Sequence, residues 1–504
     1  MSGDRSAPKC AVLVVGAGIM GAGIAQVAAQ AGHPVWLFDA REDAAQAAID
    51  KLRSSLTALV AKGKMTASEA HALVTNIRPA VHLADAAHST IVVEAIVEQL
   101  QAKRALWQQL EGIVGADCVF ASNTSSISIT AMAQGLRHPE RLVGMHFFNP
   151  VPLMRLVEVV SGLHTAADIA AGVFALAQSW GKVAVHARST PGFIVNRIAR
   201  PYYAEALALL QEQCISPVAL DACLKAVGFR MGPCELMDLI GHDTNFAVTE
   251  SVYQANFYDK RYTPSLLQRE LVDGGLLGRK SGRGIYDYAE GAVKPQLETA
   301  QTVDVPTRDG VQLHGSGRRV DIWAARLKTA GVSFSHEYAG DWIGLSTPGV
   351  QLRQTDGRTA SSLGTNVAVF DIGFAAETSG VLAWAPSVRA SEACVAEAHA
   401  WLSALAYQPQ KMADQSGLVV ARTVAMLINE AADAVQQGVC TVDGANQAMR
   451  LGVNYPAGPF DWLDVWGAQG VIQVLEALDS QYRGERYRVS PWLRQQACAA
   501  IQDL

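Results

Sequence analysis

The sequence has little excess charge, no long apolar run and no paired cysteines. Its 504 residues include 41 basic and 47 acidic side chains, which leaves a net charge of −6. So small an imbalance gives no indication of a nucleic-acid partner. No apolar run approaches the roughly 20 residues that a membrane-spanning helix needs, so we expect no membrane partner. The N-terminus is polar and short and lacks the apolar region of a signal peptide, which predicts a cytoplasmic location.

The eight cysteines are scattered along the chain and form no C-x-x-C pair. Their spacings match neither a zinc site nor a disulfide framework, so we predict free thiols in a reducing compartment and no bound metal. Half of the residues are hydrophobic and 17% are charged, which is typical of a folded globular protein. Because a single hydrophobic core rarely serves so long a chain, we expect several domains.

The first two predicted domains differ in their sequence pattern. In residues 1–188, short and nearly continuously apolar runs alternate with helical stretches. This alternation predicts an α/β domain whose parallel sheet is covered by helices on both faces. The pattern of residues 189–290 indicates helices throughout. One of these helices is expected to start near Gly192 and to kink at Pro201 in its interior.

The third segment, residues 300–406, has a weaker α/β pattern. We find no glycine fingerprint after its first predicted strand. The elements that we predict there are strands at Val332–Ser335, Val367–Ile372 and Val381–Trp384, and a helix at Ile322–Ala330.

The fourth segment, residues 407–504, is helical and repeats the second domain. Gly192–Arg197 aligns with Gly417–Arg422, about 225 residues later. A repeat of this length indicates a domain duplication and not a solenoid. The predicted fold is therefore an α/β domain followed by an all-α domain, and then a degenerate second α/β plus all-α copy.

A glycine-rich turn follows the first predicted strand. Residues 11–21 read Ala-Val-Leu-Val-Val-Gly16-Ala-Gly18-Ile19-Met20-Gly21, which is G-x-G-x-x-G between an apolar strand and a helix. Gly16 permits the tight turn, Gly18 lets the backbone approach a pyrophosphate, and Gly21 lets the helix and the strand pack closely. The free N–H groups at the helix start attract phosphate. We therefore predict a Rossmann-type dinucleotide site that includes Ile19 and Met20 as well as the three glycines.

The second predicted strand ends in Asp39, 18 positions after Gly21. An acidic side chain at this place can accept hydrogen bonds from the adenosine ribose, and it would repel a 2′-phosphate. NAD is therefore predicted as the cofactor in preference to NADP. Arg41 follows two residues later and could soften that preference.

His146 and Glu158 lie in two apolar strands that flank the turn Asn149-Pro-Val-Pro152. An ionised glutamate among valines is costly unless it is paired, and His146 is the obvious partner. A carboxylate bonded to one ring nitrogen fixes the tautomer and raises the basicity of the other nitrogen. The pair therefore predicts a general base that removes a proton from an alcohol during hydride transfer. The plainer alternative is a solvated glutamate and a core histidine bonded to backbone.

Four stretches in order along residues 11–288 resemble the 3-hydroxyacyl-CoA dehydrogenases of β-oxidation. They are Ala121-Ser-Asn-Thr-Ser-Ser126, Met145-His-Phe-Phe-Asn-Pro-Val-Pro152, Pro191-Gly-Phe-Ile-Val-Asn-Arg197 and Gly278-Arg-Lys-Ser-Gly-Arg-Gly-Ile-Tyr-Asp-Tyr288. The resemblance implies NAD-dependent oxidation of an (S)-3-hydroxyacyl-CoA to the 3-oxoacyl-CoA. It implies that His146 and Glu158 are the catalytic dyad, and that Ser125 and Asn196 hold the C3 oxygen of the substrate.

The same resemblance implies further contacts. Glu98, Lys103 and Asn123 fall at or beside NAD-contacting positions of the family, and Asn149 falls beside the substrate. Ser55 and Lys62 fall near the helical arm that contacts CoA. The partner that these residues imply is an acyl-CoA substrate.

The two-copy layout resembles the subgroup that handles 3-hydroxyadipyl-CoA in phenylacetate breakdown, and also some 3-hydroxybutyryl-CoA enzymes. A dicarboxylic acyl chain would need a cation at the far end of its pocket. Arg155, Arg200 and Arg230 are candidates, and the sequence does not choose between them.

The second copy has lost the residues of the chemistry, since Ala421 stands where Asn196 is in the first. We therefore predict one active site per chain. Helical domains of the family pair across a dimer interface, so we expect the second helical copy to pack on the first, and the protein to be a homo-oligomer, a dimer. Two rival interpretations are a free-acid dehydrogenase, which would use a lysine base, and a non-catalytic structural or NAD-sensing relative, which would have lost the base.

Overall fold

The computed structural model describes residues 10–502 except 294, 298–309 and 375–379. The polar N-terminus and the predicted start of the third segment at residue 300 lie outside the described residues. The chain divides into two compact units, Met1–Arg197 with Gln437–Val453, and Ile198–Gln436 with Asn454–Leu504. We call them unit 1 and unit 2 and describe each by itself. None of the described helices combines the length and the apolar character needed to cross a membrane.

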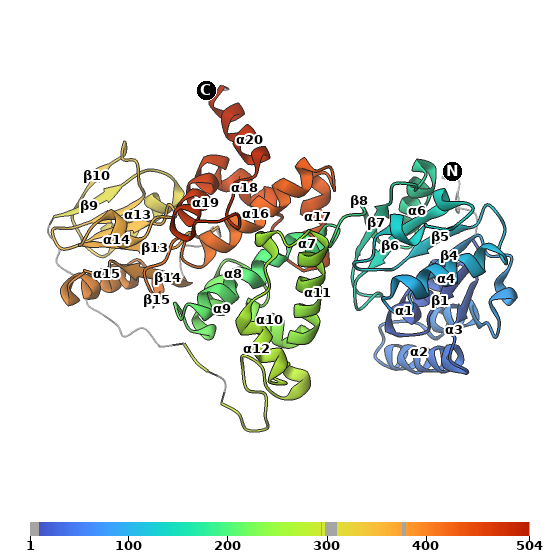
Figure 1. Cartoon of the computed structure of the whole chain (residues 1–504). Helices are drawn as coiled ribbons and strands as arrows, with labels where there is room; N and C mark the ends of the chain where they lie inside the picture. Colours follow the sequence, from blue (N-terminus) through green and yellow to red (C-terminus); the bar gives the residue numbers. More distant parts are fainter. Residues whose placement is uncertain (1–9, 294, 298–309, 375–379, 503–504) are drawn as a thin grey trace, which may run out of the picture. The chain divides into compact units, whose positions relative to one another are not determined.

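Unit 1 is built on a sheet of order β3-β2-β1-β4-β5-β6-β7-β8, coloured blue to teal in Figure 1. Neighbouring strands are parallel except β6 and β7, which are antiparallel. The strands are β1 (Val12–Val15), β2 (Val35–Phe38), β3 (Ile77–Pro79), β4 (Ile91–Glu94), β5 (Val119–Ser122), β6 (Leu142–Phe147), β7 (Leu156–Ser161) and β8 (Val183–Arg188). The sequence pattern missed β3, because this edge strand is short and ends in proline.

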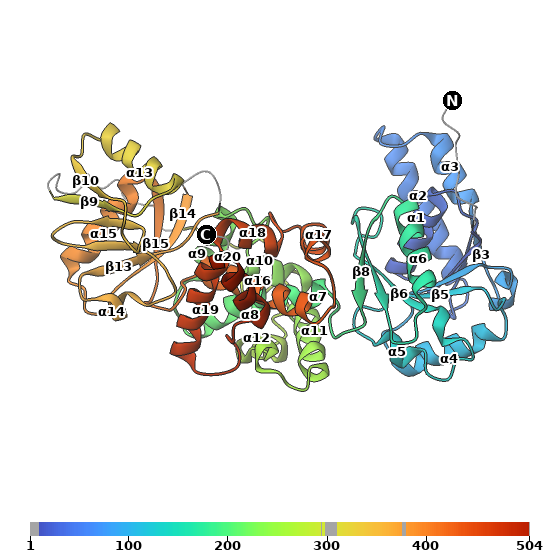
Figure 2. The same cartoon turned by 90° about the horizontal axis from the view of Figure 1, so that it is seen from above.

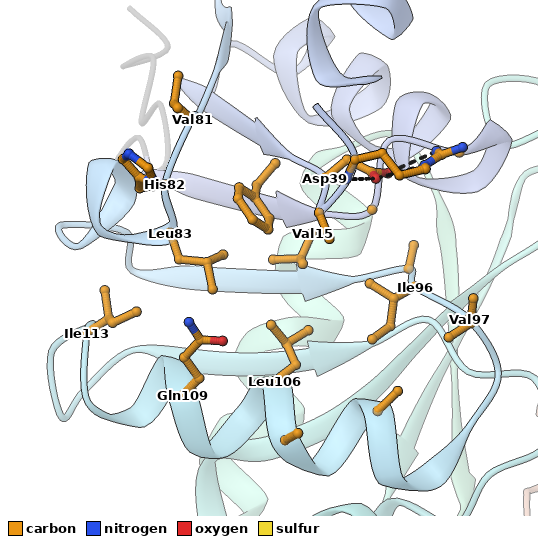
Figure 3. Close-up of a pocket in the computed structure, with 18 of the residues that line it drawn as sticks. Val15, Asp39, Val81, His82, Leu83, Ile96, Val97, Leu106, Gln109 and Ile113 are labelled. Atoms are coloured by element: carbon orange, nitrogen blue, oxygen red, sulfur yellow. Dashed lines mark hydrogen bonds and ion pairs between the residues drawn. The ribbon is translucent and has the colours of Figure 1, made fainter. Parts of the chain in front are cut away.

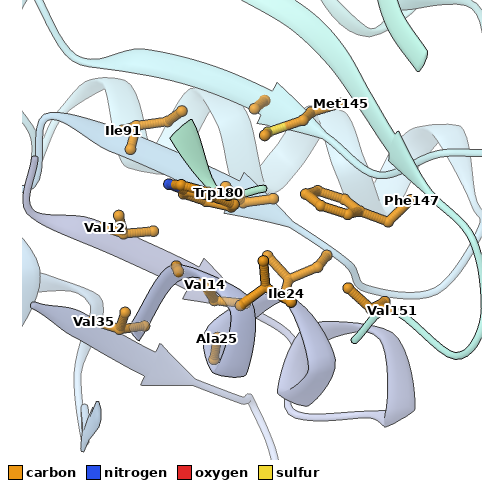
Figure 4. Packing of buried hydrophobic residues seen from close by; sticks show 14 of the residues in the cluster. Val12, Val14, Ile24, Ala25, Val35, Ile91, Met145, Phe147, Val151 and Trp180 are labelled. Carbon is orange, nitrogen blue, oxygen red and sulfur yellow. The ribbon is translucent and has the colours of Figure 1, made fainter. Parts of the chain in front are cut away.

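Helices cover both faces of this sheet, as the continuous apolar strands predicted. In Figure 2, α1, α2 and α6 lie on one face and α4 and α5 on the other. The helices of unit 1 are α1 (Ile19–Gln30), α2 (Ala44–Ala61), α3 (Ala67–Thr75), α4 (Leu100–Glu111), α5 (Ile129–Met132), α6 (Ala167–Ser179), α7 (Val195–Ile198) and α17 (Val442–Gly452). Figure 4 shows the core on the α1 face, where Ile24 packs over Val12 and Val14.

The helix that was expected to run from Gly192 through Pro201 is in fact two helices. Helix α7 ends at Ile198, and α8 (Arg200–Gln211) begins two residues later with Pro201 in its first turn. The first turn of a helix tolerates proline because its N–H groups have no partner within the helix. The predicted interior kink is therefore wrong, and a break between two helices replaces it.

In unit 2, the two helical copies pack on each other through α8 and α16, as expected from the duplication. The buried Glu205 of α8 bonds to Arg422 of α16, and the buried Glu430 of α16 bonds to Arg261 and Tyr262 of the first copy. The helices are α8, α9 (Pro217–Ala226), α10 (Pro233–Ile240), α11 (His242–Ala255), α12 (Leu266–Asp273), α16 (Val420–Gln436), α18 (Pro459–Trp466), α19 (Ala468–Tyr482) and α20 (Pro491–Gln502).

Unit 2 also contains a smaller mixed sheet of order β10-β9-β11-β12-β13-β14-β15. A short antiparallel strand, β11, stands beside β9 where β4 stands beside β1 in the first sheet. The elements are β9 (Val311–His314), β10 (Phe334–Glu337), β11 (Gly344–Ser346), β12 (Gln351–Gln354), β13 (Val367–Phe370), β14 (Gly380–Pro386) and β15 (Tyr407–Lys411), with α13 (Arg318–Thr329), α14 (Ala360–Leu363) and α15 (Glu392–Ala404).

The sequence pattern missed β9, which precedes the strand that was predicted to be first. Strand β9 leads through Gly315-Ser-Gly317 into α13, with Val320 at the place of the third glycine. The complete fingerprint is absent there, but its first two glycines remain. The Trp342 ring stacks on His314 at the end of this strand, with centroids 3.9 Å apart.

Candidate active site

The glycine turn between β1 and α1 has the geometry that a dinucleotide needs. Gly16 has φ +108°, and a Cβ there would come within 2.4 Å of the Ala95 carbonyl oxygen. A Cβ on Gly21 would come within 1.7 Å of the Gly16 carbonyl oxygen. A Cβ on Gly18, in contrast, would meet nothing within 4 Å. The first and third glycines are thus required for packing, and the second leaves open space at the start of α1, where phosphate binds.

Asp39 lies at the end of β2 and faces this turn. Its carboxylate accepts a hydrogen bond from the Ala17 N–H at 2.8 Å and is bonded by the Arg41 Nε at 3.0 Å. Burial opposes the charge, but the hydrogen bonds from Arg41 and Ala17 prevail and lower the pKa of Asp39 to about 2. The carboxylate is therefore ionised at neutral pH and can accept hydrogen bonds from ribose hydroxyls.

A cavity of about 980 Å³ extends from the turn across the carboxyl ends of the strands. Figure 3 shows Asp39 at one side of it and a largely apolar wall that includes Leu83, Val97 and Leu106. The sequence analysis missed this wall, because its residues are scattered over several loops and α4 and share no motif. The residues present thus fit a dinucleotide, with a wall for a flat apolar base and a carboxylate for a ribose.

Glu98 organises the loop after β5. Its carboxylate accepts hydrogen bonds from the Ser125 N–H at 2.9 Å and from the hydroxyls of Thr124 and Ser126 at 2.7 and 3.1 Å. Burial works against the charge of Glu98, but the Lys103 ammonium, 3.2 Å away, lowers its pKa. The structure therefore brings Glu98, Lys103 and Ser125 together.

Lys103 itself is almost wholly buried, with 1% of its side chain exposed. It bonds to the buried Glu94 as well as to Glu98. Lys103 is not among the residues that line the large cavity, and its contact with the site is through Glu98.

His146 and Glu158 face each other on the antiparallel strands β6 and β7. The Nδ1 atom of His146 lies 2.6 Å from one carboxylate oxygen of Glu158, and both side chains are buried. The other carboxylate oxygen accepts the N–H groups of Ile194 and Val195, at 3.1 and 3.0 Å. Glu158 thus joins the histidine to the backbone that immediately precedes Asn196, at the start of α7.

Two further contacts shape the surroundings of His146. The Asn123 side-chain oxygen accepts the Phe147 N–H at 2.8 Å, which ties the end of β5 to β6. The rings of Phe148 and Phe193 lie 4.5 and 5.9 Å from the imidazole, measured between centroids. The sequence analysis did not assign a role to these two rings, which line the histidine with apolar surface.

A second cavity of about 580 Å³ lies between α1, α2 and the loop after β6. Ser55 and Asn149, both predicted to bind the substrate, line it together with Lys51 and Arg41. Lys62 does not line it, since it caps the far end of α2 and is exposed. The sequence analysis missed Lys51, although it precedes Ser55 by one helical turn and so shares its face.

Comparison with protein families agrees with these observations. Residues 11–190 match the NAD binding domain of 3-hydroxyacyl-CoA dehydrogenase, and residues 192–288 and 417–500 match its C-terminal domain twice. The chain belongs to the 3-hydroxyacyl-CoA dehydrogenase family. Residues 352–415 match the reduced Rossmann-fold domain of 3-hydroxybutyryl-CoA dehydrogenase.

Relatives of this 3-hydroxyacyl-CoA dehydrogenase match it at full length or over its first half. The 3-hydroxyadipyl-CoA dehydrogenase of Escherichia coli (strain K12) is 41% identical over 96% of this chain and 97% of its own. A probable 3-hydroxybutyryl-CoA dehydrogenase of Bacillus subtilis (strain 168) is 42% identical over 55% of this chain and 97% of its own. The crystal structure of 3-hydroxybutyryl-CoA dehydrogenase from Escherichia coli K12 superposes with a TM-score of 0.89 and 40% identity, covering 98% and 100% of the two chains.

The second sheet of this 3-hydroxyacyl-CoA dehydrogenase shows what replaced the dyad. Asp371 and Ala383 occupy the places of His146 and Glu158, because the same β-pairing brings them opposite each other on the β13–β14 pair. The Asp371 carboxylate accepts the N–H groups of Val419, Val420 and Ala421 at the start of α16. It thus does for α16 what Glu158 does for the backbone before Asn196, but the residue opposite it is Ala383 and not a base.

NAD is the cofactor of this 3-hydroxyacyl-CoA dehydrogenase, as the match to the NAD binding domain shows. Among the described residues, no group of three or more His, Cys, Asp or Glu side chains could hold a metal ion.

Proposed function

We propose that this chain oxidises an (S)-3-hydroxyacyl-CoA to the 3-oxoacyl-CoA with NAD, and that the chemistry takes place at His146. The observation that carries the proposal is the buried pair of His146 and Glu158, 2.6 Å apart, in the same unit as the glycine turn. An alcohol dehydrogenase needs a base whose tautomer and orientation are fixed. A core histidine bonded to backbone, the plainer alternative, would not be bonded to a buried carboxylate.

His146 is the general base in this mechanism. Because Glu158 bonds to Nδ1, the basic lone pair is at Nε2, which takes the proton of the substrate hydroxyl. The Glu158 carboxylate stabilises the imidazolium that forms, and the rings of Phe148 and Phe193 exclude water from this ion pair. NAD, when bound, supplies the acceptor for the hydride of the alcohol carbon.

Ser125 and Asn196 are the two groups proposed to hold the C3 oxygen. A hydroxyl and an amide can bond to the alcohol first and then to the carbonyl oxygen that develops from it. Glu98 orients Ser125 through the Ser125 N–H and hydroxyl. Glu158 orients Asn196 through the two N–H groups before it.

We propose 3-hydroxyadipyl-CoA, in phenylacetate catabolism, as the substrate. The support is the Escherichia coli relative of that name, which this chain matches over nearly its whole length. The alternative is 3-hydroxybutyryl-CoA, in fatty-acid or butanoate metabolism, which the B. subtilis relative and the superposed crystal structure carry in their names. Of the three arginines considered for a distal carboxylate, Arg200 is buried and bonded to Thr249, whereas Arg155 and Arg230 are exposed.

The test is NADH formation from NAD with each of the two thioesters, using the wild type and His146→Ala. We expect turnover of both, faster for 3-hydroxyadipyl-CoA, and a loss of about 10²–10⁴-fold in kcat in the variant. His138→Ala is the matched control, because His138 is exposed and bonds to Glu140 at the surface. Its kcat should equal that of the wild type.

Each other outcome has a clear meaning. Faster turnover of 3-hydroxybutyryl-CoA would agree with the proposed mechanism, but would assign the enzyme to fatty-acid or butanoate metabolism. Absence of turnover with either thioester would contradict the proposal and favour the non-catalytic or free-acid interpretation. The dimeric state and the cytoplasmic location stay predictions, which size-exclusion chromatography with light scattering and cell fractionation would test.

A further inference from the structure

One part of the second helical copy lies in the unit that holds the catalytic pair. We call Gln437–Val453, which contains α17, the cross-copy segment. By sequence it belongs to the degenerate copy, yet α17 packs on β7 and β8 of the first sheet. At the end of β8, the Arg188 N–H donates to the Val439 carbonyl at 2.9 Å.

The equivalent contact recurs in unit 2 with the copies exchanged. There α9 of the first helical copy packs on β14 of the second sheet. The Ala413 N–H donates to the Cys214 carbonyl, also at 2.9 Å. Ala413 and Val439 lie 225 positions after Arg188 and Cys214, the spacing of the duplication. The same bond is therefore formed at both equivalent positions. In each case a helix of one copy packs on the sheet of the other copy.

In unit 1 the cross-copy segment contacts the residues on both sides of Asn196. On one side, a Cβ on Gly452 would come within 2.9 Å of a Val195 methyl group and within 2.8 Å of a Leu156 methyl group, so the glycine lets α17 lie close to both. On the other side, Arg197 donates a hydrogen bond to the Gln437 side-chain oxygen at 2.8 Å. Arg197 is itself 4% exposed, whereas Gln437 is exposed, so the bond joins a buried guanidinium to the surface of the cross-copy segment.

Glu158 also bonds to the backbone just before Asn196. The Val195 N–H bonds to the Glu158 carboxylate, whose other oxygen bonds to His146. Val195, the residue before Asn196, therefore lies between β7 and the cross-copy segment.

We propose that the cross-copy segment positions Asn196 relative to His146, with Gln437 and Gly452 as the positioning residues; this rests on the proposed function of the site. The degenerate copy thus supplies a support that the catalytic copy does not contain. A displacement of about 1 Å of a substrate-orienting group costs on the order of 10²-fold in rate. The support therefore governs kcat, while the glycine turn and Asp39 continue to govern NAD binding.

The experiment compares variants of the full chain. Gln437→Ala removes the acceptor of Arg197, and Gln437→Glu keeps an acceptor at the same place. Gly452→Val forces α17 away from Val195. Gln447→Ala is the matched control, because Gln447 is an exposed residue of the same helix. We expect kcat to fall about tenfold in Gln437→Ala and about 10²-fold in Gly452→Val. KM for the acyl-CoA and the dissociation constant of NADH should stay unchanged, and Gln437→Glu should restore most of kcat.

A second measurement does not depend on turnover. Hydrogen–deuterium exchange of the peptide that contains Ile194–Arg197 should be faster in Gln437→Ala and Gly452→Val than in the wild type, and unchanged in Gln447→Ala. Wild-type exchange and wild-type kcat in both variants would overturn the inference. A parallel loss of NADH binding and kcat, without rescue by Gln437→Glu, would also overturn it, because it would show a general structural role. An inactive wild type would refute the proposed function, and the exchange data would still decide the inference.

Discussion

Glu205 and Arg422 form a wholly buried ion pair that joins the first helical copy to the second. Arg486 bonds to the other carboxylate oxygen of Glu205, so two guanidinium groups share one carboxylate. Burial opposes the charge of Glu205, but the two arginines prevail and lower its pKa. The buried carboxylate of the first copy therefore has its cationic partners only when the second copy is in place.

We expect Glu205→Ala to lower the free energy of unfolding by about 3–5 kcal/mol, because it leaves buried cations without their partner. Urea unfolding would measure the loss. The control is Glu476→Ala, which removes an exposed pair with Arg494 and should cost less than about 1 kcal/mol. Equal losses in the two variants would show that the buried pair does not hold the copies together.

The bond between Arg41 and Asp39 bears on cofactor choice. We expect Asp39→Ala to lower kcat/KM for NAD about tenfold or more, because the ribose loses an acceptor. It should also raise kcat/KM for NADP, because the released Arg41 can bind a 2′-phosphate. Steady-state kinetics with both cofactors would measure this. In the double variant Asp39→Ala/Arg41→Ala, the increase in kcat/KM for NADP should disappear. If the increase persists, Arg41 is not its cause.

Lys51 and Lys62 are rival candidates for contact with CoA. Lys51 lines the same cavity as Ser55 and Asn149, whereas Lys62 does not. We expect Lys51→Ala to raise KM for the acyl-CoA several-fold at low salt, with less effect at high salt because ions screen the attraction to phosphate. Lys62→Ala should change KM less, and KM for NAD should be unchanged in both. A larger effect of Lys62→Ala would favour the position that the family resemblance implies.

Asp371 predicts a pH effect on stability. Burial raises its pKa from 3.8 to about 6, although four backbone N–H groups oppose the shift. Between these values the unfolded chain has lost the proton and the folded chain keeps it, so this group lowers the free energy of unfolding as pH rises from about 4 to about 6. Asp371→Asn should lack that decline. Urea unfolding at several pH values would test this, and a constant difference between variant and wild type would contradict it.

Much of the fold could be predicted because its signals are local. The glycines of the first turn, the apolar strands beside them and the position of Asp39 all lie within 30 residues. His146 and Glu158 were predictable for a similar reason, since two adjacent strands joined by a turn place residues twelve apart opposite each other. The repeat of about 225 residues predicted the contact between α8 and α16.

Other features gave no local signal. Strand β9 is short, and its Gly-x-Gly turn lacks the third glycine. The apolar wall of the large cavity comes from several loops and α4. Lys103 was expected beside NAD, but only the packing around it shows that its side chain is enclosed between Glu94 and Glu98.

The sequence by itself determined the order of the domains, the dinucleotide turn, the pairing of His146 with Glu158 and the duplication. These follow from hydrogen-bonding periodicity and from residues close together in the chain, whose geometry is limited by backbone sterics. Only the tertiary structure decided that α17 of the second copy packs beside the backbone around Asn196, and that Asp371, at the place of His146, bonds to the start of α16. The contacts of Asp371 span about 50 positions and those of the cross-copy segment more than 200. Contacts at such separations depend on how whole surfaces pack, and no local pattern encodes that choice.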